Sequence, residues 1–216
     1  NNAMSKTFDL ITLGEVLIDM FPDQIGGRIG EVEKFIPKPG GAPANVAVAA
    51  SRLGGETAFI GKVGQDHFGT YLKEVLDGEG VDTRGVCFDP EARTTMAIIA
   101  MPDANTAEFV FYRNPGADQR LQVSDLDESL LRSTRAFHFG SVSLTDEPAR
   151  SATLAAARMA RRAGALVSFD VNYRPSLWKD PELALEQTRK MLPEVDLVKV
   201  NETEAALLTG VDQLTP

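Results

Sequence analysis

The stretch that decides the fold is residues 40–54, GGAPANVAVAASRLG. Its two leading glycines carry no Cβ, so the backbone can approach another group closely. Pro43 suits the first turn of a helix, where its missing N–H is not needed, and the Ala- and Val-rich run predicts a small-residue helix over 44–53. Asn45 falls in that first turn, beside N–H groups without a partner in the helix. Such a helix start suits a hydroxyl-rich neutral ligand as well as an anion. The alternative is an ordinary glycine-rich connection.

Apolar strands alternate with helical segments on both sides of this stretch. Strands that are apolar throughout are buried on both faces, so the pattern indicates an α/β fold. We expect a mostly parallel central sheet with helices on both sides. The predicted strands are residues 8–13, 57–63, 136–140, 166–171 and 197–200, and the predicted helices are 44–53, 68–79, 147–163, 181–192 and 202–208.

Two regions interrupt this alternation. Residues 28–37 have no helical period, and residues 93–113 contain two β-rich runs that a turn separates at 102–105. No crossover helix lies between these runs, so we predict a small antiparallel lid sheet. The alternative is a pair of extra edge strands on the central sheet. Alternating apolar positions are expected to give the lid one apolar face that joins two copies of the chain: Met96, Ile98, Phe109 and Phe111.

The bulk composition excludes several classes of partner. The formal net charge of −9 argues against nucleic acid and anionic membranes as main partners. The single cysteine, Cys87, excludes an intrachain disulfide and fits a cytoplasmic protein. No apolar run approaches the roughly 18 residues of a membrane span. Residues 1–3 precede Met4 and are interpreted as a cloning remnant, so we expect one domain over residues 4–216.

The spacing from the glycine pair through Asn45 to Gly54 and Gly64 resembles the first signature of the PfkB, or ribokinase-like, family of carbohydrate kinases. The resemblance implies a three-layer α/β/α fold with a small β-sheet lid. Residues 14–19, GEVLID, resemble the family's first sugar-binding strand end, and Asp19 could accept hydrogen bonds from two adjacent hydroxyls. The implied substrate-binding residues of this part of the chain are Asp19, Gly40, Gly41 and Asn45.

Two later runs carry further resemblances. Residues 111–118 read FYRNPGAD and resemble the corresponding stretch of bacterial and plant fructokinases, which implies that Arg113 contacts the substrate and that the sugar is fructose. Residues 170–174 read DVNYR and resemble the family's Asp-x-Asn-x-Arg strand end. Asn172 and Arg174 are two residues apart on an extended segment, so we expect both to face the same cleft.

Residues 201–204, NETE, resemble the family's Asn-x-x-Glu motif. The resemblance implies that Asn201 and Glu204 serve the nucleotide, with Glu204 ordering waters around Mg²⁺ rather than ligating it. The alternative, which residue chemistry alone favours, is a helix with an asparagine cap and an acidic first turn.

The family's catalytic segment, a glycine-rich loop ending in Asp, comes near the C-terminus, and this sequence has no such loop before Pro216. We therefore interpret the chain as C-terminally incomplete and inactive by itself, with the general-base Asp beyond Pro216. The implied activity is ATP-dependent phosphorylation of fructose to fructose 6-phosphate, with Mg²⁺, and with K⁺ in members that have a monovalent-cation site. The alternatives are a kinase for 2-keto-3-deoxygluconate or a riboside, and a non-catalytic binding protein derived from a kinase.

Overall fold

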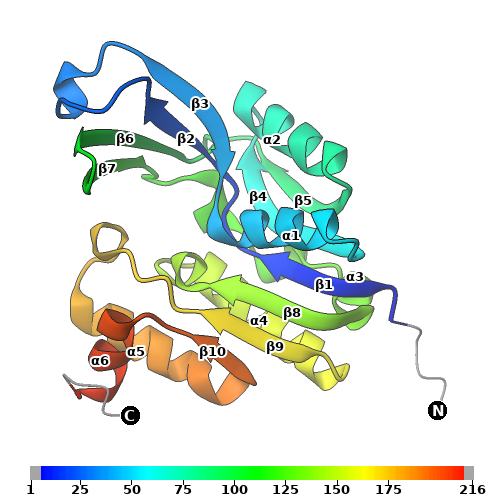
Figure 1. Cartoon of the computed structure of the whole chain (residues 1–216). Helices are drawn as coiled ribbons and strands as arrows, with labels where there is room; N and C mark the ends of the chain where they lie inside the picture. The colour runs from blue at the N-terminus through cyan, green and yellow to red at the C-terminus, as the bar shows by residue number, and fades with distance from the viewer. Residues whose placement is uncertain (1–5, 212–216) are drawn as a thin grey trace.

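The computed structural model describes residues 6–211, and the interpreted cloning remnant at residues 1–3 lies outside them. A six-stranded parallel sheet forms the centre, in the order β10-β9-β8-β1-β4-β5 (Figure 1). This confirms the predicted parallel α/β architecture. Its strands are β1 (Phe8–Leu13), β4 (Thr57–Gly64), β5 (Val81–Asp89), β8 (Thr134–Gly140), β9 (Leu166–Asp170) and β10 (Leu197–Lys199).

The predicted strands omitted β5. This strand lies at one edge of the sheet, and its exposed or half-buried polar positions, such as Asp82 and Arg84, interrupt the apolar run. An edge strand needs to bury less of its surface than a central one, so the run of apolar residues that signals a buried strand is missing.

Helices cover both faces of the sheet and make three layers. Alternate residues of β4 point to opposite faces of the sheet. Ala58 and Ile60 belong to one buried cluster, while Phe59 and Val63 belong to another. The first cluster includes five of the six alanines of α4, and the second includes residues of α1 and α2. The helices are α1 (Ala42–Arg52), α2 (His67–Gly78), α3 (Glu128–Arg132), α4 (Ala149–Arg162), α5 (Pro181–Met191) and α6 (Glu202–Thr209). Short 3-10 helices lie at η1 (Ile29–Glu31), η2 (Ala117–Arg120), η3 (Val123–Asp125), η4 (Ser141–Leu144), η5 (Pro175–Leu177) and η6 (Leu192–Glu194).

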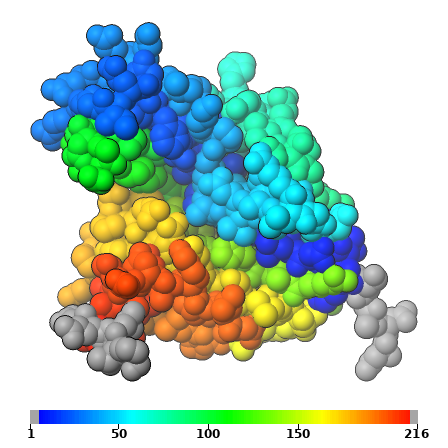
Figure 2. Space-filling model, viewed as in Figure 1, coloured from blue at the N-terminus to red at the C-terminus, as the bar shows by residue number. Residues whose placement is uncertain are grey.

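A second sheet of four strands overhangs one end of the central sheet, in the order β3-β2-β6-β7. Its strands are β2 (Leu17–Pro22), β3 (Phe35–Gly40), β6 (Met96–Asp103) and β7 (Thr106–Tyr112). The lid is therefore a separate sheet, and the alternative of extra edge strands on the central sheet is wrong. Figure 2 shows the notch between the lid, in blue and green, and the yellow segment after β9.

The structure corrects four expectations about the lid. The sheet is mixed rather than antiparallel, because β2 and β6 run parallel to each other. β2 was not predicted, because its apolar run is short and carries Asp19 in the middle. Within residues 28–37 the strand begins only at Phe35. The four apolar residues expected on one face lie on two, since Met96 pairs with Tyr112 and Ile98 with Val110, whereas Phe109 pairs with Ile99.

Within residues 6–211, no helix combines the length and the apolar character that crossing a membrane requires.

Candidate functional site

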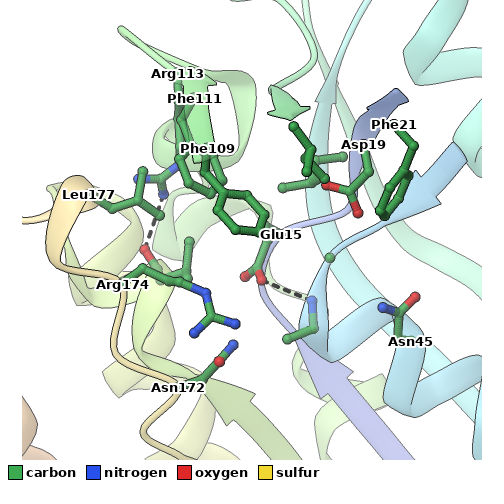
Figure 3. A pocket seen from close by; sticks show the side chains of 15 residues that line it. Glu15, Asp19, Phe21, Asn45, Phe109, Phe111, Arg113, Asn172, Arg174 and Leu177 are labelled. Carbon is green, nitrogen blue, oxygen red and sulfur yellow. Dashed lines mark hydrogen bonds between the residues drawn. The ribbon is translucent and has the colours of Figure 1, made fainter. Parts of the chain in front are cut away.

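A cavity of about 240 Å³ lies between the lid, the start of α1 and the loop after β9, and we call it the lid cavity (Figure 3). The carboxyl ends of parallel strands are where ligands bind in open α/β sheets. The cavity brings together residues that are far apart in the sequence. It is lined by Glu15, Leu17, Asp19, Phe21, Gly41, Ala42, Asn45, Ile99, Phe109, Phe111, Arg113, Val142, Asn172, Arg174 and Leu177.

Six of the seven residues expected to bind substrate line this cavity, and Gly40 is the exception. Gly40 instead makes room for the side chain of Asp19, because a Cβ at residue 40 would lie 2.0 Å from Asp19 Oδ2. Gly41 has a φ of 105°, and a Cβ there would lie 2.3 Å from the carbonyl oxygen of Glu15. Gly41 is therefore required by close packing of backbone against backbone, whereas the absence of a Cβ at Gly40 leaves room for the carboxylate of Asp19.

Asp19 and Asn45 offer polar atoms to the lid cavity from two different elements. Asp19 is half-buried on β2, and burial raises the pKa of its carboxyl above the ordinary value. Asn45 is exposed in the first turn of α1. Among the described residues, no protein group hydrogen-bonds either side chain, so both are free to bind a ligand.

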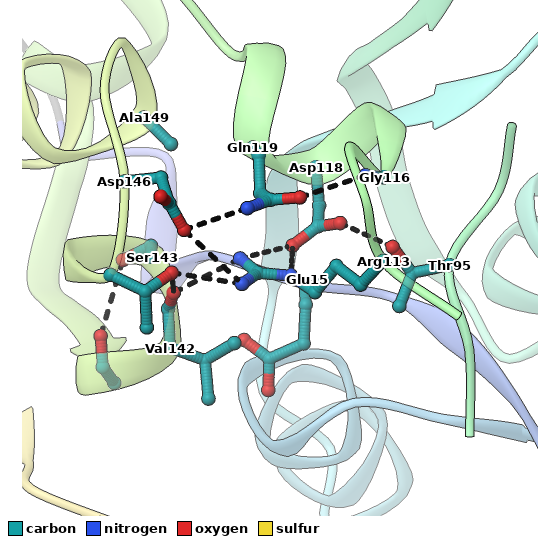
Figure 4. A network of polar contacts seen from close by, with 12 residues as sticks. Glu15, Thr95, Arg113, Gly116, Asp118, Gln119, Val142, Ser143, Asp146 and Ala149 are labelled. Carbon is teal, nitrogen blue, oxygen red and sulfur yellow. Dashed lines mark hydrogen bonds and ion pairs between the residues drawn. The ribbon is translucent and has the colours of Figure 1, made fainter. Parts of the chain in front are cut away.

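Arg113 also lines the lid cavity, but its guanidinium is bound to the protein (Figure 4). Nε donates to Asp118 Oδ2 at 2.7 Å, Nη1 to Thr145 Oγ1 at 2.8 Å and Nη2 to the carbonyl of Val142 at 3.1 Å. The side chains of Arg113 and Asp118 are 3% and 4% exposed. Most of the five guanidinium donors are thus used within this network.

Asn172 and Arg174 reach the lid cavity from the loop that follows β9. Asn172 has a φ of 37°, in the left-handed region that few residues other than glycine adopt. Asparagine is one of the few residues besides glycine that visit this region routinely. Arg174 is exposed, and its only side-chain hydrogen bond within residues 6–211 is a long one, 3.4 Å from Nη1 to the carbonyl of Tyr173.

Glu15 is a lining residue that the sequence interpretation missed. Its side chain is buried, Oε1 accepts a hydrogen bond from Ala42 N at 3.0 Å, and Oε2 has no partner among the described residues. Burial raises the pKa of Glu15 to about 7. The signal was in the sequence, because Glu15 follows Gly14 in the same run that pointed to Asp19.

The lid supplies the apolar part of the cavity wall, which the sequence interpretation also missed. Phe21, Phe109 and Phe111 line it, and the rings of the last two stack with centroids 6.4 Å apart. Period-two alternation along β7 predicted that these two side chains share a face, but we assigned that face to a contact between two copies of the chain. The cavity thus has aromatic groups on one side and carboxylate, amide and guanidinium groups on the other.

Asn201 and Glu204 lie at the start of α6, outside the lid cavity. Asn201 Oδ1 accepts from Glu204 N at 2.8 Å, and Glu204 Oε2 accepts from Asn201 N at 2.9 Å, which is a capping box. Glu204 Oε1 also accepts from Tyr173 N at 2.7 Å, so this buried carboxylate ties α6 to the loop after β9. The cap that we weighed as the alternative is present.

No group of three or more His, Cys, Asp or Glu side chains suited to a metal ion occurs between residues 6 and 211. Glu204 is buried and both its carboxylate oxygens already accept backbone hydrogen bonds, so this group is poorly placed to ligate a metal ion directly.

Comparison with known proteins places this chain in a family. The model of the pfkB family of carbohydrate kinases matches residues 7–216, so the chain belongs to that family. The chain is 44% identical over 209 residues to probable fructokinase-5 of Arabidopsis thaliana, which covers 97% of the chain and 64% of the relative. It thus spans slightly less than two thirds of that relative's length.

Solved structures agree with this assignment. The fructokinase of Xylella fastidiosa with bound ATP superimposes with a TM-score of 0.86 at 37% identity, covering 94% of this chain and 64% of that one. A double mutant of fructokinase from Vibrio cholerae O395, in fructose, ADP and potassium ion bound form, gives a TM-score of 0.81 at 35% identity and covers 95% of this chain and 64% of that one. The ribokinase-like fold of this chain is therefore established.

Proposed function

We propose that this protein is part of an ATP-dependent sugar kinase whose substrate is fructose and whose product is fructose 6-phosphate. The observation that carries the proposal is the convergence of Asp19, Asn45, Asn172 and Arg174 on one small cavity under the lid. The curated relative and the two solved structures, all described as fructokinases, support the choice of sugar.

In this proposal the free polar groups of the lid cavity hold the sugar hydroxyls. Asp19 accepts hydrogen bonds from hydroxyls, while Asn45 and Asn172 can both donate and accept. Phe109 and Phe111 exclude water from the apolar faces of the sugar, which strengthens the polar contacts. Arg113 acts indirectly, because its network holds the wall of the cavity rather than offering donors to it.

In this proposal ATP binds beside the start of α6, near the C-terminal end of the chain. Asn201 and Glu204 lie at the start of α6, where they would adjoin ATP, and Mg²⁺ would bridge the nucleotide phosphates while touching Glu204 only through water. K⁺ is proposed as a further ligand, because the Vibrio cholerae neighbour is in a potassium-bound form. We propose that the general base is an Asp in the segment that the relatives have beyond the matched residues.

The lid is also the proposed dimer interface. Its face opposite the lid cavity carries Val110 and Tyr112, which are 43% and 61% exposed. Burying such a surface and covering the free strand edges would both favour association of two lids. Sedimentation at micromolar concentration tests this, and a strictly monomeric protein would contradict it. A cytoplasmic location, expected from the single Cys87, likewise remains a prediction.

A coupled ADP-release assay with a panel of sugars tests the function. The panel contains fructose, 2-keto-3-deoxygluconate and a riboside, because an exposed arginine such as Arg174 could also bind the carboxylate of a sugar acid. The assay compares residues 1–216 with a chain that extends to the length of the relatives. We expect the longer chain to have its highest kcat/KM on fructose.

For residues 1–216 alone we expect no turnover, since loss of a general base typically costs a factor of about 10²–10⁴. Turnover by this chain within tenfold of that of the longer chain would show that our assignment of the general base to the further segment is wrong. A longer chain that binds sugars but never releases ADP would favour the non-catalytic alternative.

A further inference from the structure

Glu15 joins the end of β1 to the start of α1. Its Oε1 accepts a hydrogen bond from Ala42 N at 3.0 Å. Backbone packing reinforces this contact, since a Cβ on Gly41 would lie 2.3 Å from the Glu15 carbonyl oxygen and one on Gly14 would lie 2.6 Å from Pro43 Cγ. Residues 14–16 and 41–43 therefore form one closely packed unit.

This unit lies between two groups that line the lid cavity. Asn45 is in the first turn of α1, just beyond Ala42, and Asp19 is on β2, which begins two residues after Glu15. Glu15 itself lines the cavity, and Figure 3 shows its carboxylate bonded to the start of α1. The hydrogen bond from Ala42 N to Glu15 therefore links the helix that carries Asn45 to the segment that leads into the strand of Asp19.

Glu15 is the charged group of this unit, and its surroundings make its charge sensitive to pH. Burial raises its pKa to about 7; the neighbouring Asp118 adds to this, and Arg113 opposes it. Asp19 and Arg174 are the other charged groups on the lid cavity. An ionised carboxylate accepts a stronger hydrogen bond than a neutral one and is favoured at a helix N-terminus, so ionisation would tighten the contact with α1.

We propose that Glu15 is a positioning residue of the acceptor-sugar site, whose ionised carboxylate holds the first turn of α1 so that Asn45 and Asp19 can bind the same sugar. The proposal rests on the function proposed above. It requires no contact between Glu15 and the sugar, which agrees with the burial of Oε2.

The test measures binding of D-fructose to the full chain by isothermal titration calorimetry near pH 6 and pH 8. Glu15→Gln keeps an oxygen for Ala42 N but removes the charge, and Glu15→Ala removes both. We expect the wild-type Kd to fall by about threefold or more between the lower and the higher pH. At both pH 6 and pH 8, Glu15→Gln should bind fructose with the Kd that the wild type has at pH 6. Glu15→Ala should bind about tenfold more weakly than both the wild type and Glu15→Gln.

Two results would overturn the proposal: wild-type affinity in Glu15→Ala, or a wild-type pH dependence in Glu15→Gln, which would assign the titration to another group such as Asp19. Asp19→Asn is the control for the site itself and should weaken binding at both pH values. If that control weakens binding while the Glu15 variants do not, only this proposal fails. If no sugar of the panel binds even the wild type, the proposed function fails as well.

Discussion

Asp19 and Arg113 both border the lid cavity, yet their polar atoms are used in opposite ways. The carboxylate of Asp19 has no hydrogen-bonding partner among residues 6–211, whereas the guanidinium of Arg113 binds Asp118, Thr145 and Val142. A charged residue beside a cavity can thus either leave its polar atoms free for a ligand or use them in hydrogen bonds that hold the cavity wall together. Which of these it does depends on whether its donors and acceptors are already satisfied.

The largest expected effect is on stability and concerns the Arg113 network in the wall of the lid cavity. Arg113→Ala should lower the free energy of unfolding by about 3–5 kcal/mol, because it leaves the buried carboxylate of Asp118 without its counterion. Urea denaturation measures this. Arg28→Ala is the matched control, since Arg28 pairs with Glu108 at the surface and should cost less than about 1 kcal/mol. Equal losses in the two variants would mean that the Arg113 network does not hold the fold.

Glu15→Gln should change stability in a pH-dependent way. The pKa of Glu15 is raised from 4.5 to about 7 in the fold, so its stabilising contribution is complete below the ordinary pKa and is lost as pH rises through the folded value. The variant lacks this loss and should be more stable than the wild type by up to about 3 kcal/mol near pH 8. Thermal unfolding near pH 4 should show almost no difference. A constant difference at all pH values would mean that Glu15 does not titrate as described.

Asp19→Ala should weaken sugar binding rather than lower the stability of the fold. Losing a charged hydrogen-bonding partner costs about 1.5–3 kcal/mol, so the fructose KM of a catalytically complete chain should rise at least about tenfold. Asp23→Ala is the matched control, because Asp23 is exposed just beyond the same strand and does not line the lid cavity. If KM stays unchanged in Asp19→Ala, this carboxylate does not belong to the sugar site.

The smallest expected effect concerns the cap of α6. Asn201→Ala should lower stability by about 0.5–2 kcal/mol through loss of the capping hydrogen bond, and should leave fructose affinity unchanged. Asn201→Asp keeps an acceptor for Glu204 N and should stay near the wild type. Weakened fructose binding in Asn201→Ala would show that this helix start reaches the sugar side of the molecule.

The sequence alone determined the parallel architecture and the helix at the glycine pair, and its family resemblance indicated six of the residues that line the lid cavity. The first two features depend on short-range rules: apolar periodicity, the conformational freedom of glycine and the place of Pro43 in a first turn. Residues at the ends of neighbouring parallel strands meet at one edge whatever the details of packing. Asn172 and Asp19 were named together because both stand in runs that resemble the family's signatures, since Asp19 lies on the lid strand β2 rather than at the end of a central strand.

Only the tertiary structure decided what each of these side chains does. Arg113 is bound to Asp118 and Thr145, and Glu204 accepts a hydrogen bond from Tyr173 N across another loop. The burial that raises the pKa of Glu15 and the register that places Met96 and Phe109 on opposite lid faces are equally non-local. A sequence shows which polar atoms a residue carries. Whether those atoms are satisfied depends on groups that the fold brings beside them, and these groups lie up to 33 residues away for Arg113, whose Nη1 also faces Asp146.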